Sequence, residues 1–336
     1  GSLKKRDREQ AKAALADGRI RVAVGTHALF QDDISFANLG LAVVDEQHRF
    51  GVAQRLALKN KGSSVHQLMM SATPIPRTLA MSFFADLDVS SIDSLPPGRT
   101  PIKTRLANNA RRTEIEGFVL ANCRKGRQAY WVCPLIEESE TLQLQTAIDT
   151  QAELQAALPE LKIGLVHGRM KPAEKAETMA AFAAGSLNVL VATTVIEVGV
   201  DVPNAALMVI EHAERMGLSQ LHQLRGRVGR GAAAGTCVLL FAEPLGEVAK
   251  ARLKVIYENT DGFEIARRDL EIRGPGEFLG ARQSGAPMLR FADLSQDLHL
   301  LEAARELAPK LIAENPAAVA AHLERWLGSR EGYLGA

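Results

Sequence analysis

An adjacent pair of carboxylates, Asp45 and Glu46, follows the apolar run at residues 41–44. Such a run is typical of a buried strand, and ligands collect beyond the carboxyl ends of the strands in a parallel sheet. Two carboxylates at that place suit ATP hydrolysis, because one can hold Mg²⁺ through water while the other acts as a general base. An acidic pair after a strand also suits the N-cap of a helix, so the pair alone leaves both interpretations open.

A second cluster is the segment QLRGRVGR, which begins at Gln223 and contains Arg227 and Arg230. Guanidinium groups remain charged and suit neutralising the charge that develops on a transferred phosphoryl group. On a helix, the spacing of three would place Arg227 and Arg230 on one side. The alternative interpretation is a basic helix face that pairs with surface acids.

Hydroxyl, glycine and acidic residues follow two further apolar runs. They are Ser71 and Thr73 after residues 66–70, and Thr193, Gly199 and Asp201 after residues 189–192. Ser71 and Thr73 could instead cap a helix that begins near Ile75. Neither set identifies a chemistry by itself, and the order of all the clusters along the chain is more informative.

The elements that must position these residues alternate between apolar strands and helical stretches, which predicts an α/β fold with parallel sheets. We expect a helix at residues 3–17 that ends at Gly18, and a linker at residues 95–101, where three prolines and a glycine fall within seven positions. The expected strands are residues 19–25, 39–44, 66–70, 128–132, 163–166, 188–192, 206–210 and 235–241. From about residue 243 the pattern is helical. The expected domains are 1–95, 96–244 and 245–336.

The composition is that of an ordinary soluble protein, with 336 residues, 46% hydrophobic and 24% charged. No apolar run approaches the roughly 20 residues that would span a bilayer. The three cysteines have no CxxC spacing, which favours reduced thiols in a cytoplasm. The net charge of +1 neither favours nor excludes nucleic acid, since binding depends on local charge.

The order of five segments resembles superfamily 2 helicases, in which two RecA-like lobes bind ATP in the cleft between them. The segments are DEQH, SATPIPRTLA, VHGRM, VATTVIEVGVD and QLHQLRGRVGRG. Within that group, GTHALFQ, DEQHRFGVAQR, LPPGRTPI, RQAYWVCPLIEES and RDLEIRGPGEFLGARQSG resemble the RecG family. The likeness extends over residues 3–336 and implies two RecA-like lobes, the first one incomplete, followed by a C-terminal helical hairpin and coupling segment.

The resemblance also implies an activity and its partners. The activity would be that of an ATP-dependent DNA helicase and double-stranded-DNA translocase, which remodels stalled replication forks and Holliday junctions in recombination and repair. ATP and Mg²⁺ would be the cofactors and branched double-stranded DNA the partner. A single-stranded-DNA-binding protein is a further candidate partner. No membrane is implied, and the intact enzyme would be a monomer that associates with the bacterial nucleoid in the cytoplasm.

Site residues are carried over from the resemblance one by one. Asp45 would hold Mg²⁺ through water and Glu46 would be the base, while Gln223, Arg227 and Arg230 would complete the catalytic group. Gly199 and Asp201 would lie near the nucleotide. The residues that would face DNA or couple nucleotide state to DNA grip are Thr26, His27, Ser71, Thr73, His167, Gly168, Thr193, Arg273 and Gln283.

The chain departs from the family pattern because it contains no GxxxxGK[ST] loop and no Gly-Lys dipeptide. That loop normally cradles the nucleotide phosphates. The family's fork-splitting wedge domain has no counterpart in these 336 residues either. We therefore expect this chain alone to bind ATP weakly and to be inactive as an ATPase.

Two alternative functions remain open from the sequence. The first is the motor of a transcription-repair coupling factor, although Gln47-His48 and the segment PPGRT at residues 96–100 favour RecG. The second is a non-catalytic DNA-binding or interaction fragment. In the tail, basic and acidic residues alternate, which predicts mutual ion pairs and no basic DNA patch. They are Arg252, Arg267, Arg268, Arg273 and Arg282 with Glu258, Asp261, Glu264, Asp269, Glu271 and Glu277.

Overall fold

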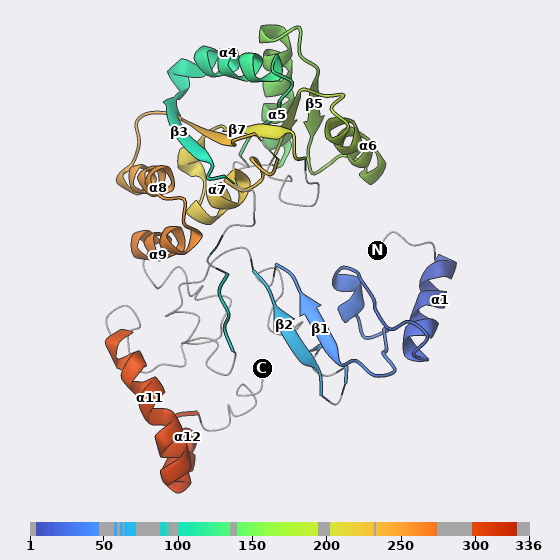
Figure 1. The fold of residues 1–336 in the computed structure, drawn as a ribbon, viewed down its shortest axis with the longest axis vertical. Coiled ribbons are helices and arrows are strands. Elements are labelled where there is room, and N and C mark those ends of the chain that lie inside the picture. The colour runs from blue at the N-terminus through green and yellow to red at the C-terminus, as the bar shows by residue number, and fades with distance from the viewer. Residues whose placement is uncertain are drawn as a thin grey trace. The chain divides into compact units, whose positions relative to one another are not determined.

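The computed structural model of the chain describes residues 5–46, 57–58, 61–62, 64–71, 88–92, 94, 100–134, 140–193, 202–231, 233–273 and 298–327. Their contacts divide the chain into two compact units, Gly1–Ala72 with His299–Ala336, and Thr73–Leu298. Figure 1 shows the elements of each unit along the chain. Among the helices in these ranges, none is both long and apolar enough to cross a membrane.

The first unit contains a short parallel sheet of β1 (Leu41–Val44) and β2 (His66–Met69). Helix α1 (Lys5–Ala16) precedes it and is followed by Gly18, whose φ of 79° confirms the expected glycine stop. The short 3-10 helix η1 (His27–Phe30) lies between α1 and β1. A small core of Ala42, Val44 and Leu58 supports the sheet.

The prediction of a strand at residues 19–25 is wrong, because this segment forms no strand in the structure. Val22 and Val24 are 80% and 96% exposed. A strand needs a neighbouring backbone for its hydrogen bonds, and none of the described strands pairs with this segment. The apolar pattern predicts burial correctly only when such a neighbour is present.

The second unit is built on a six-stranded sheet, in the order β3-β8-β7-β4-β6-β5, and every pairing is parallel. Its strands are β3 (Lys103–Asn108), β4 (Gln128–Val132), β5 (Ile163–Val166), β6 (Val189–Ala192), β7 (Ala205–Ile210) and β8 (Thr236–Phe241). Five of them were predicted to within one residue at each end. The edge strand β3 was not predicted, because exposed polar residues alternate along it.

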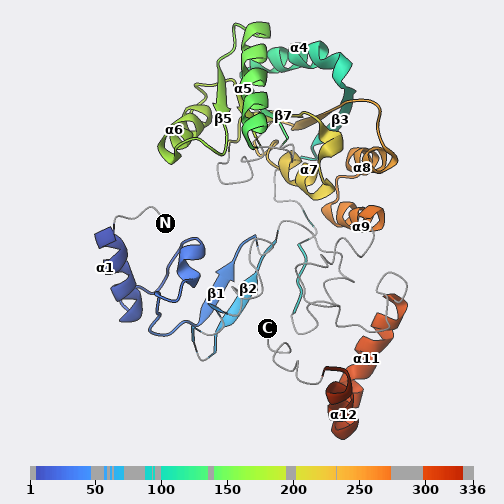
Figure 2. The ribbon, with the colours of Figure 1, turned by 180° about the vertical axis from the view of Figure 1, so that it is seen from behind.

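Helices cover both faces of this sheet, as Figure 1 and Figure 2 show from opposite sides. One hydrophobic cluster holds Trp131 with residues of α4 (Arg112–Cys123) and α5 (Glu140–Ala157). The other holds Tyr130 with residues of the helices on the opposite face. These are α6 (Pro172–Ala183), α7 (Leu218–Arg225), α8 (Glu247–Glu258) and α9 (Gly262–Arg273). Trp131 and Tyr130 are neighbours on β4 and point to opposite faces of the sheet, as expected for a strand that is buried on both sides.

Helices α8 and α9 pack against each other and form a helical hairpin after the last strand. Helices α11 (Leu298–Glu314) and α12 (Pro316–Leu327) follow later in the chain, and Asn315 caps α12 by accepting a hydrogen bond from Ala318 N at 3.1 Å. The predicted α/β class, with parallel sheets and a C-terminal helical hairpin, is confirmed. The three cysteines are buried and free, in agreement with the expected reduced thiols.

We predict that the strands of the first unit exchange their amide hydrogens faster than β4, β6 and β7. One face of its sheet is open, since Leu41, Val43 and Leu68 are 51–60% exposed. A two-stranded sheet is only marginally stable by itself. Hydrogen exchange measured by mass spectrometry on the monomeric chain would test this, and equal protection of β1 and β4 would contradict it.

Candidate nucleotide and nucleic-acid site

Two polar residues lie side by side at the carboxyl ends of β5 and β6. Val166 pairs with Ala192 in the sheet, so that the next residues, His167 and Thr193, are neighbours at this edge. The backbone N of Thr193 donates to the carbonyl of Val166 at 3.3 Å. Gly168 follows His167 in an exposed turn.

The side chains of both residues contain a buried polar atom without a hydrogen-bond partner in the described part of the chain. These atoms are His167 Nδ1 and Thr193 Oγ1. Burial lowers the pKa of His167, and repulsion from Arg169 lowers it further, which favours the neutral imidazole. Buried polar groups in native proteins are nearly always paired, so an exception points to a ligand or to water.

The acidic pair of the first unit also lies at a strand end. Asp45 follows β1 and is exposed, and its Oδ1 accepts a hydrogen bond from Glu46 N at 2.9 Å. Glu46 has a positive φ of 54°, which turns the chain sharply after the strand. Because β1 and β2 are parallel and Val44 pairs with Met69, Ser71 follows β2 at the same edge. The structure therefore brings three predicted site residues to one sheet edge.

Two further predicted residues, Thr26 and His27, lie at the start of η1. Thr26 is the N-cap residue, with an extended backbone and no side-chain capping bond. The ring of His27 lies 6.2 Å from that of Phe30, centroid to centroid. This places both residues in a short turn of the first unit, where their side chains are at least partly accessible.

The arginine segment is not helical throughout, which corrects the expectation that Arg227 and Arg230 share a helix side. Helix α7 ends at Arg225, and Gly226 caps it. Gly229 then adopts a φ of 70°, and a Cβ on it would lie 3.1 Å from the backbone of Gly235. Glycine is therefore required there both for the turn and for the close approach of the two backbones. Arg230 is exposed, and its Nε donates to Gly226 O at 3.3 Å.

Arg225, which the sequence did not single out, has a different role from its neighbours. Its side chain is buried, and Nη1 donates to the carbonyl oxygens of Ile256 and Asn259, both at 2.8 Å. Nη2 interacts with Nδ1 of His222 at 3.0 Å. Burial lowers the pKa of Arg225. The guanidinium thus joins the end of α7 to the C-terminal end of α8, where backbone carbonyls carry a partial negative charge.

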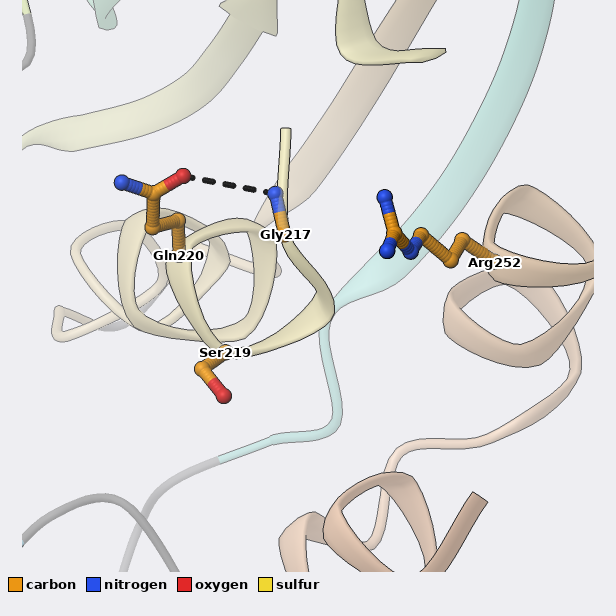
Figure 3. A pocket seen from close by; sticks show the side chains of 4 residues that line it. All are labelled: Gly217, Ser219, Gln220 and Arg252. Atoms are coloured by element: carbon orange, nitrogen blue, oxygen red, sulfur yellow. Dashed lines mark hydrogen bonds between the residues drawn. The ribbon is translucent and has the colours of Figure 1, made fainter. Parts of the chain in front are cut away.

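A cavity of about 450 Å³ lies at the other end of α7 and is lined by Gly217, Ser219, Gln220 and Arg252. In Figure 3, Arg252 of α8 points toward the start of α7, where Gln220 Oε1 accepts from Gly217 N at 3.3 Å. The Nε of Arg252 is buried without a hydrogen-bond partner in the described part of the chain. Within the described part of the chain, Arg252 makes none of the ion pairs expected for the tail.

On α9 that network is present. Glu264 accepts hydrogen bonds from Arg267 at 2.6 Å and from Arg268 at 2.9 Å, which together lower the pKa of Glu264 to about 2. Arg267 and Arg268 are about half exposed. The expectation of mutual ion pairs is confirmed for these three residues.

Several predicted site residues cannot be placed. Four of them lie outside the described residues: Thr73, Gly199, Asp201 and Gln283. Arg273 is the last residue of α9, and its side chain is not among those described. Sequence reasoning missed Arg112 and Glu211, which pair with each other, and the buried Arg225, which binds carbonyl oxygens at the end of α8. Only Arg225 had a signal in the sequence, since it stands within the arginine segment.

Comparison with known families divides the chain into three matched parts. Residues 2–82 match the DEAD/DEAH box helicase family, and residues 112–232 match the helicase conserved C-terminal domain. Residues 259–325 match the C-terminal part of domain 3 of the ATP-dependent DNA helicase RecG. The last match begins at the turn between α8 and α9 and extends into α12.

Individual relatives cover the whole chain. It is 57% identical to the ATP-dependent DNA helicase RecG of Acidithiobacillus ferridurans, over 99% of this chain and 49% of the relative. It is 55% identical to the protein of the same name from Escherichia coli strain K12, over 100% of this chain and 49% of that relative. A solved structure of RecG bound to a three-way DNA junction matches 90% of this chain and 39% of its own, with 47% identity and a TM-score of 0.68.

The chain spans about half the length of the curated relatives that it matches. The match nevertheless runs through both units and includes the α8–α9 hairpin as well as the strand-end residues. With more than half of its residues identical to those of these relatives, the chain is similar to RecG along its whole length.

Proposed function

We propose that the chain is the motor half of an ATP-dependent DNA helicase that translocates on double-stranded DNA and remodels branched substrates such as stalled forks and Holliday junctions. The observation that carries this proposal is the identity of 55–57%, along the whole chain, with proteins named ATP-dependent DNA helicase RecG. The enzyme would act as a monomer at the bacterial nucleoid, with a single-stranded-DNA-binding protein as a candidate partner.

The acidic pair supports the proposed ATP chemistry. Asp45 presents an exposed carboxylate beyond β1, and the hydrogen bond from Glu46 N orients it. Carboxylate oxygens are preferred ligands of Mg²⁺, and so Asp45 fits the role of holding the ion through water. Bound Mg²⁺ would neutralise charge on the nucleotide phosphates. Glu46 would accept a proton from the attacking water, and Ser71 and Thr73 would link this edge to DNA grip.

The turn after α7 supports a role in stabilising the transition state. Arg230 is exposed and held to the turn through Gly226 O, so its charge can be presented to a partner. Arg227 and Arg230 would place positive charge beside the transferred phosphoryl group, with Gln223 nearby on α7. Gly199 and Asp201 would complete the nucleotide contacts.

The strand ends of the second unit suit contact with the DNA backbone. Phosphate oxygens accept hydrogen bonds, and both a threonine hydroxyl and a neutral imidazole N–H can donate them. His167, Gly168 and Thr193 would form this contact, joined by Thr26 and His27 of the first unit. DNA would have to open the edge slightly, because Thr193 is 3% exposed.

The buried guanidinium of Arg225 supports coupling between nucleotide state and movement on DNA. It ties the helix that leads into Arg227 and Arg230 to the α8–α9 turn. A displacement of α7 would therefore be passed to the hairpin, because packed elements move as units. Arg273 and Gln283 would transmit the movement beyond α9.

The alternatives are not favoured. A transcription-repair coupling factor would share the motor, but residues 259–325 match the C-terminal part of domain 3 of RecG. A non-catalytic DNA-binding module would have no need for the acidic pair and the arginine turn together. The acidic pair and the arginine turn both occur in this chain, which matches RecG relatives along its own whole length.

The first prediction of this proposal concerns ATP hydrolysis in a full-length RecG enzyme that carries this sequence. Glu46→Gln should still bind ATP but hydrolyse it about 10² times more slowly or worse, because the base is removed. Arg230→Ala should lose turnover without losing fork binding. Arg124→Ala, which removes an exposed arginine paired with Glu160, is the control and should have no effect. If Glu46→Gln or Arg230→Ala hydrolyses ATP at the parental rate, the role proposed for the substituted residue is wrong.

The second prediction concerns DNA contact. Thr193→Val replaces a buried hydroxyl that has no partner with a methyl group of similar size. The free energy of unfolding should stay equal or rise by about 1 kcal/mol, while fork affinity falls several-fold. Thr150→Val, at a buried threonine on α5 that contacts Cys133, is the matched control and should lower stability without affecting DNA. Unchanged fork affinity in Thr193→Val would exclude the contact.

The third prediction concerns coupling. Arg225→Lys keeps the charge but loses the forked geometry that reaches several carbonyl groups at once. Fork unwinding should fall much further than DNA-stimulated ATPase activity, with fork binding retained. Arg267→Lys, on the exposed surface of α9, should change none of the three activities. Equal loss of ATPase and unwinding in Arg225→Lys would contradict a coupling role.

A further inference from the structure

Glu211, the residue after β7, contains a carboxylate that is buried among donors from two other elements. Its Oε1 accepts a hydrogen bond from Trp131 Nε1 at 2.9 Å and an ion-paired hydrogen bond from Arg112 Nη1. Its Oε2 lies 3.9 Å from the Sγ of Cys133. Trp131 and Cys133 belong to β4 and its end, Arg112 begins α4, and Glu211 is only 4% exposed.

A second carboxylate, Glu214, holds the same loop on its other side. Its Oε2 accepts from the backbone N of Ala242 at 3.4 Å, beyond the end of β8. Its Oε1 lies 3.3 Å from Nδ1 of His212. His212 has a positive φ of 47°, a conformation that non-glycine residues adopt only when their surroundings hold them there. The loop is thus fixed across β7, to β4 on one side and to β8 on the other.

This loop leads directly into α7. The next residues include Gly217, which starts the helix, and α7 ends at Arg225, just before Arg227 and Arg230. Leu218, Leu221 and Leu224 bury one side of α7 in the hydrophobic cluster, while the loop determines where the helix begins. The position of the first turn of α7 therefore depends on where the loop is held, as that of its last turn depends on Arg225.

We propose that Glu211 is a positioning residue for the arginine turn, acting through the loop that joins β7 to α7. The inference rests on the proposed ATPase function, since Arg227 and Arg230 need a transition state to stabilise. Removing the anchor would displace these arginines by a small distance. Charge stabilisation in a transition state is sensitive to such displacement, whereas the binding of ATP or DNA through other residues is not.

The contacts of Arg112 allow a clean substitution. Arg112 also pairs with Glu116 at 3.2 Å and with Glu153 at 3.3 Å, and its guanidinium carbon lies 5.3 Å from the ring centroid of Trp131. Glu211→Gln would therefore leave Arg112 with two carboxylates and would strand no buried charge. The amide oxygen could still accept from Trp131. The variant is expected to fold while its hold on the loop is weakened.

A purely structural role for Glu211 makes a different prediction. If Glu211 only stabilises the sheet, Glu211→Gln lowers the melting temperature and leaves the activity of the folded enzyme unchanged. If it positions the arginines, kcat falls at temperatures where the variant is fully folded. The two roles are separated by kcat together with KM, and by local hydrogen exchange.

The test uses Glu211→Gln in a full-length RecG enzyme that carries this sequence, with fork DNA and ATP. We expect kcat to fall by about fivefold or more, with the KM for ATP and the Kd for the fork within about twofold of the parental values. Residues 211–225 should exchange amide hydrogens faster, while β4 and β7 stay protected. Glu160→Gln removes the carboxylate of an exposed ion pair with Arg124 and is the control, with no change expected.

Parental kcat in a folded Glu211→Gln enzyme would overturn the inference while leaving the proposed function intact. Absence of ATPase activity in the unsubstituted enzyme would overturn the proposed function, and the inference with it. If Glu211→Gln does not fold, Arg112→Lys weakens the same anchor from α4 and keeps its charge. Parental kcat in a folded Arg112→Lys enzyme would then overturn the inference.

Discussion

The parallel pairing of β4 with both β6 and β7 is the constraint on which the second unit depends. Parallel pairing brings the carboxyl ends of neighbouring strands to one edge, so that residues far apart in sequence become neighbours. Thr193 and Glu211 follow β6 and β7, and Cys133 follows β4 between them. The proposed DNA contacts and the anchor of α7 are both consequences of this arrangement.

Helix α7 is held at its two ends by buried charged groups of opposite sign. Glu211 fixes the loop before it, and Arg225 fixes its last turn to α8. Glu211 and Arg225 are both buried, whereas the pair of Arg267 with Glu264 is exposed to solvent, which screens it. A displacement of α7 is therefore expected to move the residues that Glu211 and Arg225 contact. Such a connection would link ATP hydrolysis to movement of the α8–α9 hairpin.

The sequence predicted the strands of the second sheet closely, because buried parallel strands such as residues 128–132 and 189–192 are continuous apolar runs. It failed at residues 19–25, where none of the described strands pairs with the apolar run, and at β3, where polar residues alternate along an edge strand. The strand-end residues Asp45, His167 and Thr193 were identified from the resemblance to helicases and from the predicted ends of the strands.

The polar anchors of α7 could not be predicted in the same way. Glu211 contacts Arg112 across 99 positions of sequence, and Arg225 contacts carbonyl oxygens more than 30 positions away. Every residue has a backbone carbonyl, so residue types and their spacing could not identify the acceptors that Arg225 binds. The central claim, an ATP-driven motor for branched DNA, is tested most directly by ATPase activity of a full-length RecG enzyme that carries this sequence. The account predicts that a three-way DNA junction strongly increases the rate of ATP hydrolysis. A rate that is the same with and without DNA would contradict it.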